Sequence, residues 1–344
     1  MQEDIFFIPL RWAGPLSLHF IEQTSEELSV PLATFESPLW PSVNRGARVS
    51  RQSGGIYCTV LREQMSRSIL LEAENGREIH KLIQWLTQRE EEGKRCIERK
   101  SRFLSEIRFT THPVGRTLFV RLEAATGDAS GHNMITVAAE ALSRWICSHH
   151  AHIRPLSVSG NCCVDKKVSA INGCLGRGRE VQAEILISRK VCESTLRTTV
   201  EKMVSLTFKK NWMGSTLAGS VRSANAHFAN MILAFYLATG QDGANVVEGS
   251  QGFTCAEKEG EDLYFSVTLP HLIVGSVGNG KELPAIQSHL RQLDCLQKRA
   301  VGENARRLAQ IAAATVLCGE LSLLAALTNE GELLRTHLAL ERKR

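Results

Sequence analysis

Two adjacent lysines near the middle of the chain have the residue types and the setting for chemistry on an anion. Lys166 and Lys167 follow Asp165, just after the polar run 157–161. On an open surface such a pair is a solvated charge, whereas within a closed site it binds an anion, and one ammonium group can have a lowered pKa. These residues alone leave both interpretations open.

The glycine-rich run 275–280 is a second candidate, because it follows a strand-like stretch at 263–269. Glycine has no Cβ, so its backbone can approach a phosphate closely. The run lacks the GxGxxG spacing of the dinucleotide fingerprint and the acidic residue that follows it. An ordinary turn is therefore the alternative.

The spacing of three further polar residues does not indicate a functional site. Glu36, beside Pro38, is typical of a loop carboxylate, and Asp242 lies between two glycines as turn residues often do. His337, on an expected helix near the C-terminus, is typical of a surface histidine. Spacing does not join these residues to Lys166.

Length and composition limit the class of protein. The chain has 344 residues, which favours two domains or one domain with a large insertion. Hydrophobic residues are 43% and charged residues 22%, which excludes disorder, collagen and coiled-coil arrays as the main architecture. The net charge of +5 is too small to indicate nucleic acid, but it suits an anionic small molecule.

The cysteines and the apolar stretches indicate a cytoplasmic protein. Ten cysteines are scattered with no CxxC pair, so we expect reduced thiols and no metal. The acidic start, residues 1–4, lacks the basic region of a signal peptide. The longest apolar stretch, 228–238, is too short for a bilayer, which needs about 20 residues.

Hydrophobic periodicity predicts most of the positioning elements. Apolar residues three and four apart predict a helix over 79–86, and further helices are expected over 134–147 and 303–327. The last is Ala-rich and apolar on most sides, so we expect it in a core or a subunit interface, with Gly331 ending it. Strands are predicted over 103–109, 118–122 and 181–187, the first two joined by a hairpin at 112–115.

Turns and a charged run complete the expected organisation. Arg45-Gly46 and Gly54-Gly55 predict turns, and strand-like pieces broken by Pro and Gly are expected before them. The charge run 89–92 indicates a solvated face or a loop. Residues 69–158 resemble a split βαβ module.

Many short motifs share one order with a known family. The matching stretches are residues 8–16, 32–36, 44–46, 127–134, 159–167, 214–220, 225–227, 240–242, 262–264 and 319–323. In this order they resemble 3-hydroxy-3-methylglutaryl-coenzyme A (HMG-CoA) reductase, in the branch shared by eukaryotes, archaea and some bacteria (class I-like). The resemblance covers nearly the whole chain and is strongest from Ser157 onward.

The resemblance implies an α+β fold of two domains. A large mixed helical and sheet domain, residues 1–68 and 159–344, would bind coenzyme A. An inserted ferredoxin-like domain, residues 69–158, would bind NADP(H). It also implies a homodimer with the active site at its interface, a tetramer of two such dimers being common in this branch. The small net charge and the short apolar stretches, not the resemblance, are the reasons to expect no nucleic-acid partner and no membrane for this chain.

The implied activity is a four-electron reduction of HMG-CoA by NADPH to mevalonate and coenzyme A, an early step toward isoprenoids. By resemblance Lys166 faces the carbonyl oxygen, Glu36 donates a proton, Asp242 bridges the two, and His337 protonates the coenzyme A thiolate. A cation is needed where negative oxygen develops, and a carboxyl donates near neutrality only if its pKa is raised.

Binding residues follow in the same way. The resemblance assigns these positions to the substrate: Arg67, which would hold its carboxylate, with Ser159, Asp165, Lys167, Lys210 and Asn225. It assigns these to the nucleotide: Ser101, Arg102 and Phe103 at the adenosine 2′-phosphate, with Asp128, Asn133, Val277 and Arg342. An arginine at the 2′-phosphate favours NADPH over NADH.

The chain also departs from the family pattern. Ser130 and His132 replace two methionines of the nucleotide loop, Glu341 replaces an asparagine of the C-terminal flap, and Asn279 and Lys281 replace smaller residues. These changes motivate an alternative, a catalytically weakened relative that binds acyl-CoA or nucleotide without turnover. An RNA-binding insert is a further alternative, but its strands lack the aromatic pattern of such modules.

Overall fold

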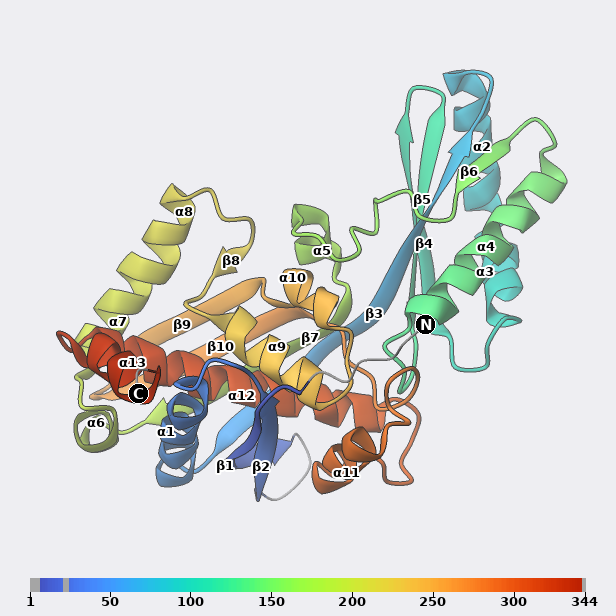
Figure 1. Ribbon diagram of the computed structural model, residues 1–344. Helices are drawn as coiled ribbons and strands as arrows, with labels where there is room; N and C mark the ends of the chain where they lie inside the picture. The colour runs from blue at the N-terminus through green and yellow to red at the C-terminus, as the bar shows by residue number, and fades with distance from the viewer. Residues whose placement is uncertain (1–6, 21–24, 342–344) are drawn as a thin grey trace.

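One long strand connects the two parts of the molecule. The computed structural model describes residues 7–20 and 25–341, except the side chains of His337 and Glu341. Strand β3 (Ile56–Glu72) pairs through its first half with the large body and through its second half with the insert. Figure 1 shows it running from the body into the insert.

The large body is built on the main path of a ten-stranded sheet, in the order β2-β1-β3-β7-β10-β9-β8. β1 and β3 pair in parallel, whereas β3–β7, β7–β10 and β10–β9 are antiparallel. The other strands are β1 (Leu10–Phe20), β2 (Glu26–Ala33), β7 (Gly178–Ile187), β8 (Ser223–Ala224), β9 (Gly252–Glu259) and β10 (Asp262–Leu272).

Helix α12 (Glu303–Leu327) is the centre of the main core, as its Ala-rich sequence predicts. It packs against α1, α9 and the strands β3, β7 and β10, and Figure 1 shows it running along the sheet. Of the described helices it alone is long and apolar enough to cross a membrane, but 94% of its most apolar window is buried inside the protein. It is therefore the core helix of this fold.

Around this core lie helices and short helical turns, most of them at the surface. They are α1 (Leu39–Gln52), α5 (Ala170–Leu175), α6 (Arg189–Val191), α7 (Val200–Leu206), α8 (Ser215–Leu217), α9 (Phe228–Ala238), α10 (Val246–Gly249), α11 (Pro284–Gln292) and α13 (Glu332–Glu341), with π-helical turns at Cys192–Leu196 and Thr207–Gly214 and a 3-10 turn at Gly243–Asn245.

The insert has its own sheet and its own core. Its strands follow the order β4-β5-β3-β6, all antiparallel. The chain order is β3, α2 (Gly76–Gln88), α3 (Glu90–Glu98), β4 (Ser105–Val114), β5 (Thr117–Ala125), α4 (His132–His149) and β6 (Arg154–Ser157). Its buried apolar residues form a cluster separate from the main core, and that cluster also includes Ile273.

The periodic elements are confirmed, and the charge run 89–92 has the predicted solvated face, since Glu91 and Glu92 are exposed at the start of helix α3. Two local predictions need correction. The hairpin connection expected at 112–115 is shorter, because β4 continues to Val114 and β5 begins at Thr117. Arg45-Gly46, predicted to be a turn, lies inside α1. A Cβ at Gly46 would overlap the backbone of Cys318 on α12, so glycine serves here as the contact point of two helices. The strand-like pieces at the start form one strand, β1, with a register shift between Ala13 and Leu16.

We therefore expect Gly46→Ala to lower the free energy of unfolding by about 1–3 kcal/mol, because the added methyl pushes α1 from α12. Urea titration followed by circular dichroism measures this. Gly214→Ala is the matched control, since the nearest atom to its Cβ would be Lys209 O at 3.6 Å. Equal stability of the two variants would contradict the close helix contact.

Candidate active site

A cavity of about 700 Å³ lies at the junction of the body and the insert. Its walls come from the loop with Lys166, the start of α4, the Gly240–Asp242 turn and the glycine-rich loop 277–281. Lys166 Nζ lies 2.6 Å from Asp242 Oδ2. The structure thus joins two residues that spacing alone left unconnected.

The charge on Lys166 keeps Asp242 ionised. Burial works to raise the pKa of Asp242, but hydrogen bonds from Lys166 and from the N–H of Ala244 outweigh it, so the pKa lies below its usual value. Both side chains remain partly open to solvent. A lysine so placed presents a cation to an anionic oxygen in the cavity.

The loop that carries Lys166 is held in an unusual backbone conformation. Asn161, Val164 and Lys166 all have positive φ, which side chains other than glycine rarely adopt. The backbone N–H of Lys166 donates to a carboxylate oxygen of Glu248. Asn172 Nδ2 donates to Val164 O at 3.0 Å.

Two fully buried arginines anchor this loop, and neither is recognisable from the sequence. Arg177 donates to Asp165 Oδ1 at 2.6 Å and to Glu248 Oε1 at 3.3 Å. Arg121, on β5 of the insert, donates to Cys162 O at 2.8 Å. Burial raises the pKa of Glu248, although Arg177 opposes that effect. Partners this far apart in sequence leave no periodic or motif signal.

The substrate residues predicted near Lys166 gather around Asp165. Arg67 Nη1 lies 3.5 Å from Asp165 Oδ2 and 3.5 Å from Ser159 Oγ. Burial works against ionisation of Asp165, but the charge of Arg177 leads the interactions that lower its pKa. The ammonium of Lys167 donates back to Asp165 O at 3.1 Å. Arg67 lines the cavity, so a guanidinium and an ammonium face the same space.

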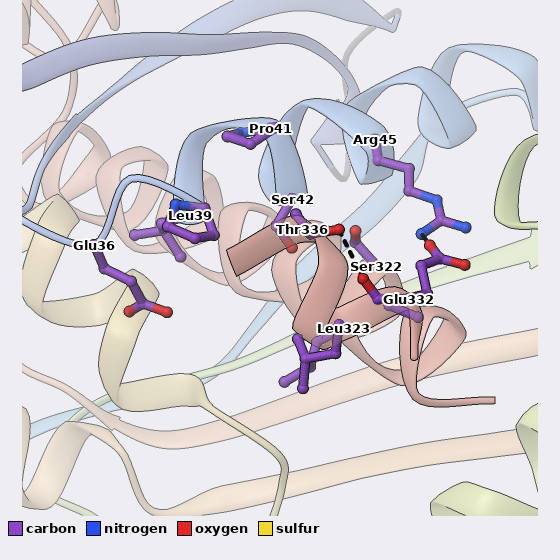
Figure 2. Close-up of a pocket in the computed structure, with 12 residues that line it drawn as sticks. Glu36, Leu39, Pro41, Ser42, Arg45, Ser322, Leu323, Glu332 and Thr336 are labelled. Carbon is purple, nitrogen blue, oxygen red and sulfur yellow. Dashed lines mark hydrogen bonds and ion pairs between the residues drawn. The ribbon is translucent and has the colours of Figure 1, made fainter. Parts of the chain in front are cut away.

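Glu36 lies elsewhere in this chain. It lines a second pocket, of about 210 Å³, between α1, α12 and α13 (Figure 2). Its Oε2 accepts a hydrogen bond from Asn230 of α9 at 2.7 Å. Arg45 and Glu332 form an ion pair at 2.8 Å across the same pocket, which joins α1 to α13. One chain therefore does not bring Glu36 to Lys166.

The remaining substrate predictions are also distributed. Lys210 is exposed on the π-helical turn Thr207–Gly214. Asn225 Nδ2 donates to Ser250 O at 3.0 Å, and its Oδ1 accepts from Phe228 N at 3.2 Å, so its amide holds the start of α9. His337 belongs to α13, but its side chain lies outside the described residues, as does all of Arg342.

Four of the predicted nucleotide residues line two cavities. Arg102 and Phe103 border a cavity of about 270 Å³ together with Arg306, which the sequence did not single out. Ser101 Oγ accepts from Phe103 N at 3.2 Å, which shapes that turn. Asn133 and Val277 line the larger cavity beside Lys166.

Residues 128–129, which lie between the two cavities, are held in place by hydrogen bonds. Asp128 accepts from the N–H groups of Gly302 and Ala305 at 3.1 and 3.0 Å, so both its oxygens cap α12. Ala129 forms a β-bridge with Val277. Gly278 borders the large cavity and has no protein atom within 4 Å of where a Cβ would be, which leaves room for a ligand.

No metal-binding group is found in the described part of the chain: nowhere in it do three or more His, Cys, Asp or Glu side chains gather as ligands.

We expect Arg177→Met to lower the free energy of unfolding by about 3–5 kcal/mol, because it leaves Asp165 and Glu248 without their cation. The loss should be larger at pH 8 than at pH 5. The folded pKa of Glu248 is already raised and would rise further, so the folded state holds a proton that it loses as pH increases.

Urea titration at both pH values measures the effect. The double variant Arg177→Met/Glu248→Gln should recover part of the loss, whereas exposed Arg291→Met should change stability by less than about 0.5 kcal/mol. A pH-independent loss would contradict the role of the Glu248 charge.

Known proteins resemble this chain along nearly its whole length. The family model described as hydroxymethylglutaryl-coenzyme A reductase matches residues 5–342. The 3-hydroxy-3-methylglutaryl-coenzyme A reductase of Aeropyrum pernix is 41% identical over 337 residues, which cover 97% of this chain and 79% of the relative. That of Pyrococcus abyssi is 40% identical, over 97% of this chain and 82% of the relative.

A solved structure shares the fold. The reductase of Streptococcus pneumoniae superposes with a TM-score of 0.74 at 18% identity, covering 94% of this chain and 86% of that one. At that identity the match concerns the fold alone. The match to the family model and the identity to these relatives settle the family: this chain belongs to the hydroxymethylglutaryl-coenzyme A reductases.

Proposed function

We propose that the chain reduces HMG-CoA to mevalonate and coenzyme A at the expense of NADPH. The observation that carries this proposal is the Lys166–Asp242 pair at 2.6 Å, which faces a cavity together with Arg67. NADPH supplies the hydrides, and a class II reductase from Streptococcus pneumoniae has been solved bound to NADPH. The reaction feeds isoprenoid synthesis.

Each residue of the pair has a defined task. The Lys166 ammonium stabilises negative charge on the acyl oxygen, and it can also give that oxygen a proton. Asp242 holds the ammonium in place and preserves its charge. Arg67, with Ser159, Asp165 and Lys167 beside it, binds the free carboxylate of the substrate, since a guanidinium matches a carboxylate in charge and geometry.

The active site is completed by a second copy of the chain. Glu36 lines a different pocket from Lys166, yet the reaction needs a proton donor beside the acyl oxygen. In a homodimer with the site at its interface, one subunit gives Lys166 and Asp242, and the other gives Glu36, Lys210, Asn225 and His337. Large apolar side chains stand exposed on the segment that carries Lys210, among them Phe208, Met213 and Leu217. Such a surface is typical of a subunit contact.

The insert, residues 69–158, is the nucleotide-binding domain and has a ferredoxin-like fold. Its strand order β4-β5-β3-β6, with α2 and α3 between β3 and β4 and with α4 between β5 and β6, supports that assignment. Ser101, Arg102 and Phe103 receive the adenosine 2′-phosphate. Asp128, Asn133 and Val277 position the rest of the nucleotide, with Arg342 near its phosphates. The body, residues 1–68 and 159–344, binds coenzyme A.

A relative that binds without turnover is the weaker proposal. The departures Ser130, His132 and Glu341 motivate it, but the lysine–carboxylate pair is formed and the cavity beside it is open. We further propose a cytoplasmic location, which fits ten cysteines that are all free.

Lys166→Ala should lower kcat by at least about 10², because it removes the charge that stabilises the oxyanion. Consumption of NADPH in the presence of HMG-CoA, followed by absorbance, measures it. Lys81→Ala, an exposed lysine of α2 that lines neither cavity, serves as control. Near-normal turnover by the Lys166 variant would overturn the assignment.

The dimeric site is tested by mixing two inactive subunits. Lys166→Ala and Glu36→Gln chains carrying different tags are co-expressed, and the hybrid dimer is purified by both tags. One of its two sites then has both native residues, so we expect roughly half of wild-type activity. An inactive hybrid would show that both residues must come from one chain.

Arg102→Ala should raise KM for NADPH about tenfold or more and leave KM for NADH unchanged, since the guanidinium meets only the extra phosphate. Initial rates with both nucleotides measure this. Arg99→Ala removes an exposed neighbouring charge as a control. An equal effect on both nucleotides would refute the phosphate contact.

A further inference from the structure

One residue that lines this cavity, His132, has an unsatisfied ring nitrogen. It is the first residue of α4, and it borders the cavity beside Lys166 and Asp242. Its side chain is 20% exposed. Its Nε2 is enclosed by protein and lies 3.7 Å from Asp165 Oδ1, with no hydrogen-bond partner among the described residues.

The surroundings fix the charge and the tautomer of the ring. Asp165 is ionised, because the charges of Arg177 and Arg67 act against burial and lower its pKa, and an ionised carboxylate only accepts. The proton of a neutral His132 therefore belongs on Nε2. Burial, with the charges of Arg177 and Lys166, lowers the pKa of His132 to about 4 against the opposite effects of Asp165 and Asp242, so the ring is neutral near pH 7.

That tautomer leaves a lone pair on Nδ1. This atom is not among the enclosed unpartnered atoms, and no described residue donates to it. The cavity therefore offers the neutral ring acceptor of His132 beside two cations, Lys166 and Arg67, and beside Asp242, which already pairs with Lys166. A ligand that brings an N–H donor fits this acceptor.

The proposed reaction says which ligand group reaches it. Hydride transfer requires the nicotinamide ring to touch the acyl carbon beside Lys166, so the ring occupies this cavity. The segment 127–132 leads directly from the cavity that contains Arg102 to His132. The carboxamide NH2 is the hydrogen-bond donor that a nicotinamide ring carries.

We propose that His132 is a positioning residue for the nicotinamide, whose carboxamide NH2 donates a hydrogen bond to Nδ1. The ring orientation of His132 is set by Asp165, so this acceptor is tied to the same buried network as Lys166. The inference rests on the proposed function, because it assumes a nicotinamide nucleotide in the cavity.

Calorimetry tests the contact without turnover. Binding of NADP⁺ is compared with that of its 3-acetylpyridine analogue, in which a methyl group replaces the amide NH2. His132→Met should weaken NADP⁺ binding about three- to tenfold, the worth of one hydrogen bond, and change analogue binding by less than about twofold. His132→Asn, which keeps an acceptor near the Nδ1 position, should recover most of the NADP⁺ affinity.

Exposed His80→Met is the control and should leave both affinities unchanged. If His132→Met weakens both nucleotides equally, or neither, the contact is refuted. If that variant does not fold, the wild type alone decides, because it must bind NADP⁺ more tightly than the analogue by the same factor. Failure of the wild type to bind either nucleotide would overturn the proposed function itself, and this inference with it.

Discussion

The position of Lys166, the proposed catalytic cation, depends on one guanidinium that is fully buried. Arg177 is fully buried and holds Asp165 and Glu248, whose carboxylate in turn accepts the N–H of Lys166. A backbone with positive φ at Lys166 and Val164 costs about 1–3 kcal/mol per residue, and it persists only where the surrounding structure imposes it. The ion pairs of Arg177 hold the loop in this conformation. The strained backbone and the buried charge therefore act together to place the Lys166 ammonium at the cavity.

Strand β3 connects this ion network to the insert. Because its first half belongs to the large sheet and its second half to the insert, the two cores are joined by continuous hydrogen-bonded backbone. Arg67 lies on the insert half of the strand, and Arg121 on β5 reaches from the insert to the Lys166 loop. The cavity therefore forms where both parts supply charged groups, and its shape changes if either part shifts.

The sequence predicts those elements whose apolar pattern follows directly from the surface they bury, and it fails where tertiary contact overrides local preference. The apolar spacing of α2 and the uniform apolarity of α12 follow directly from what each helix covers. Gly46 misled the turn prediction, since a glycine needed for close packing of two helices has the same local appearance as one needed for a turn. The Arg177–Glu248 pair spans 71 residues and has no periodic trace, so only the fold reveals it. Lys166 and Asp242 were found through family motifs rather than through spacing.

A single subunit is poorly suited to hydride transfer to a polar carbonyl. The side chains of Lys166 and Asp242 are 39% and 47% exposed, so water screens the charge that must stabilise the oxyanion. Glu36, the proposed proton donor, faces another pocket of the same chain. A second subunit across the cavity, as proposed, would exclude water from the Lys166–Asp242 pair and would also bring a carboxyl group beside it. Dissociation of the proposed dimer would accordingly abolish chemistry while leaving the proposed nucleotide residues of the insert in place, because those residues belong to one chain.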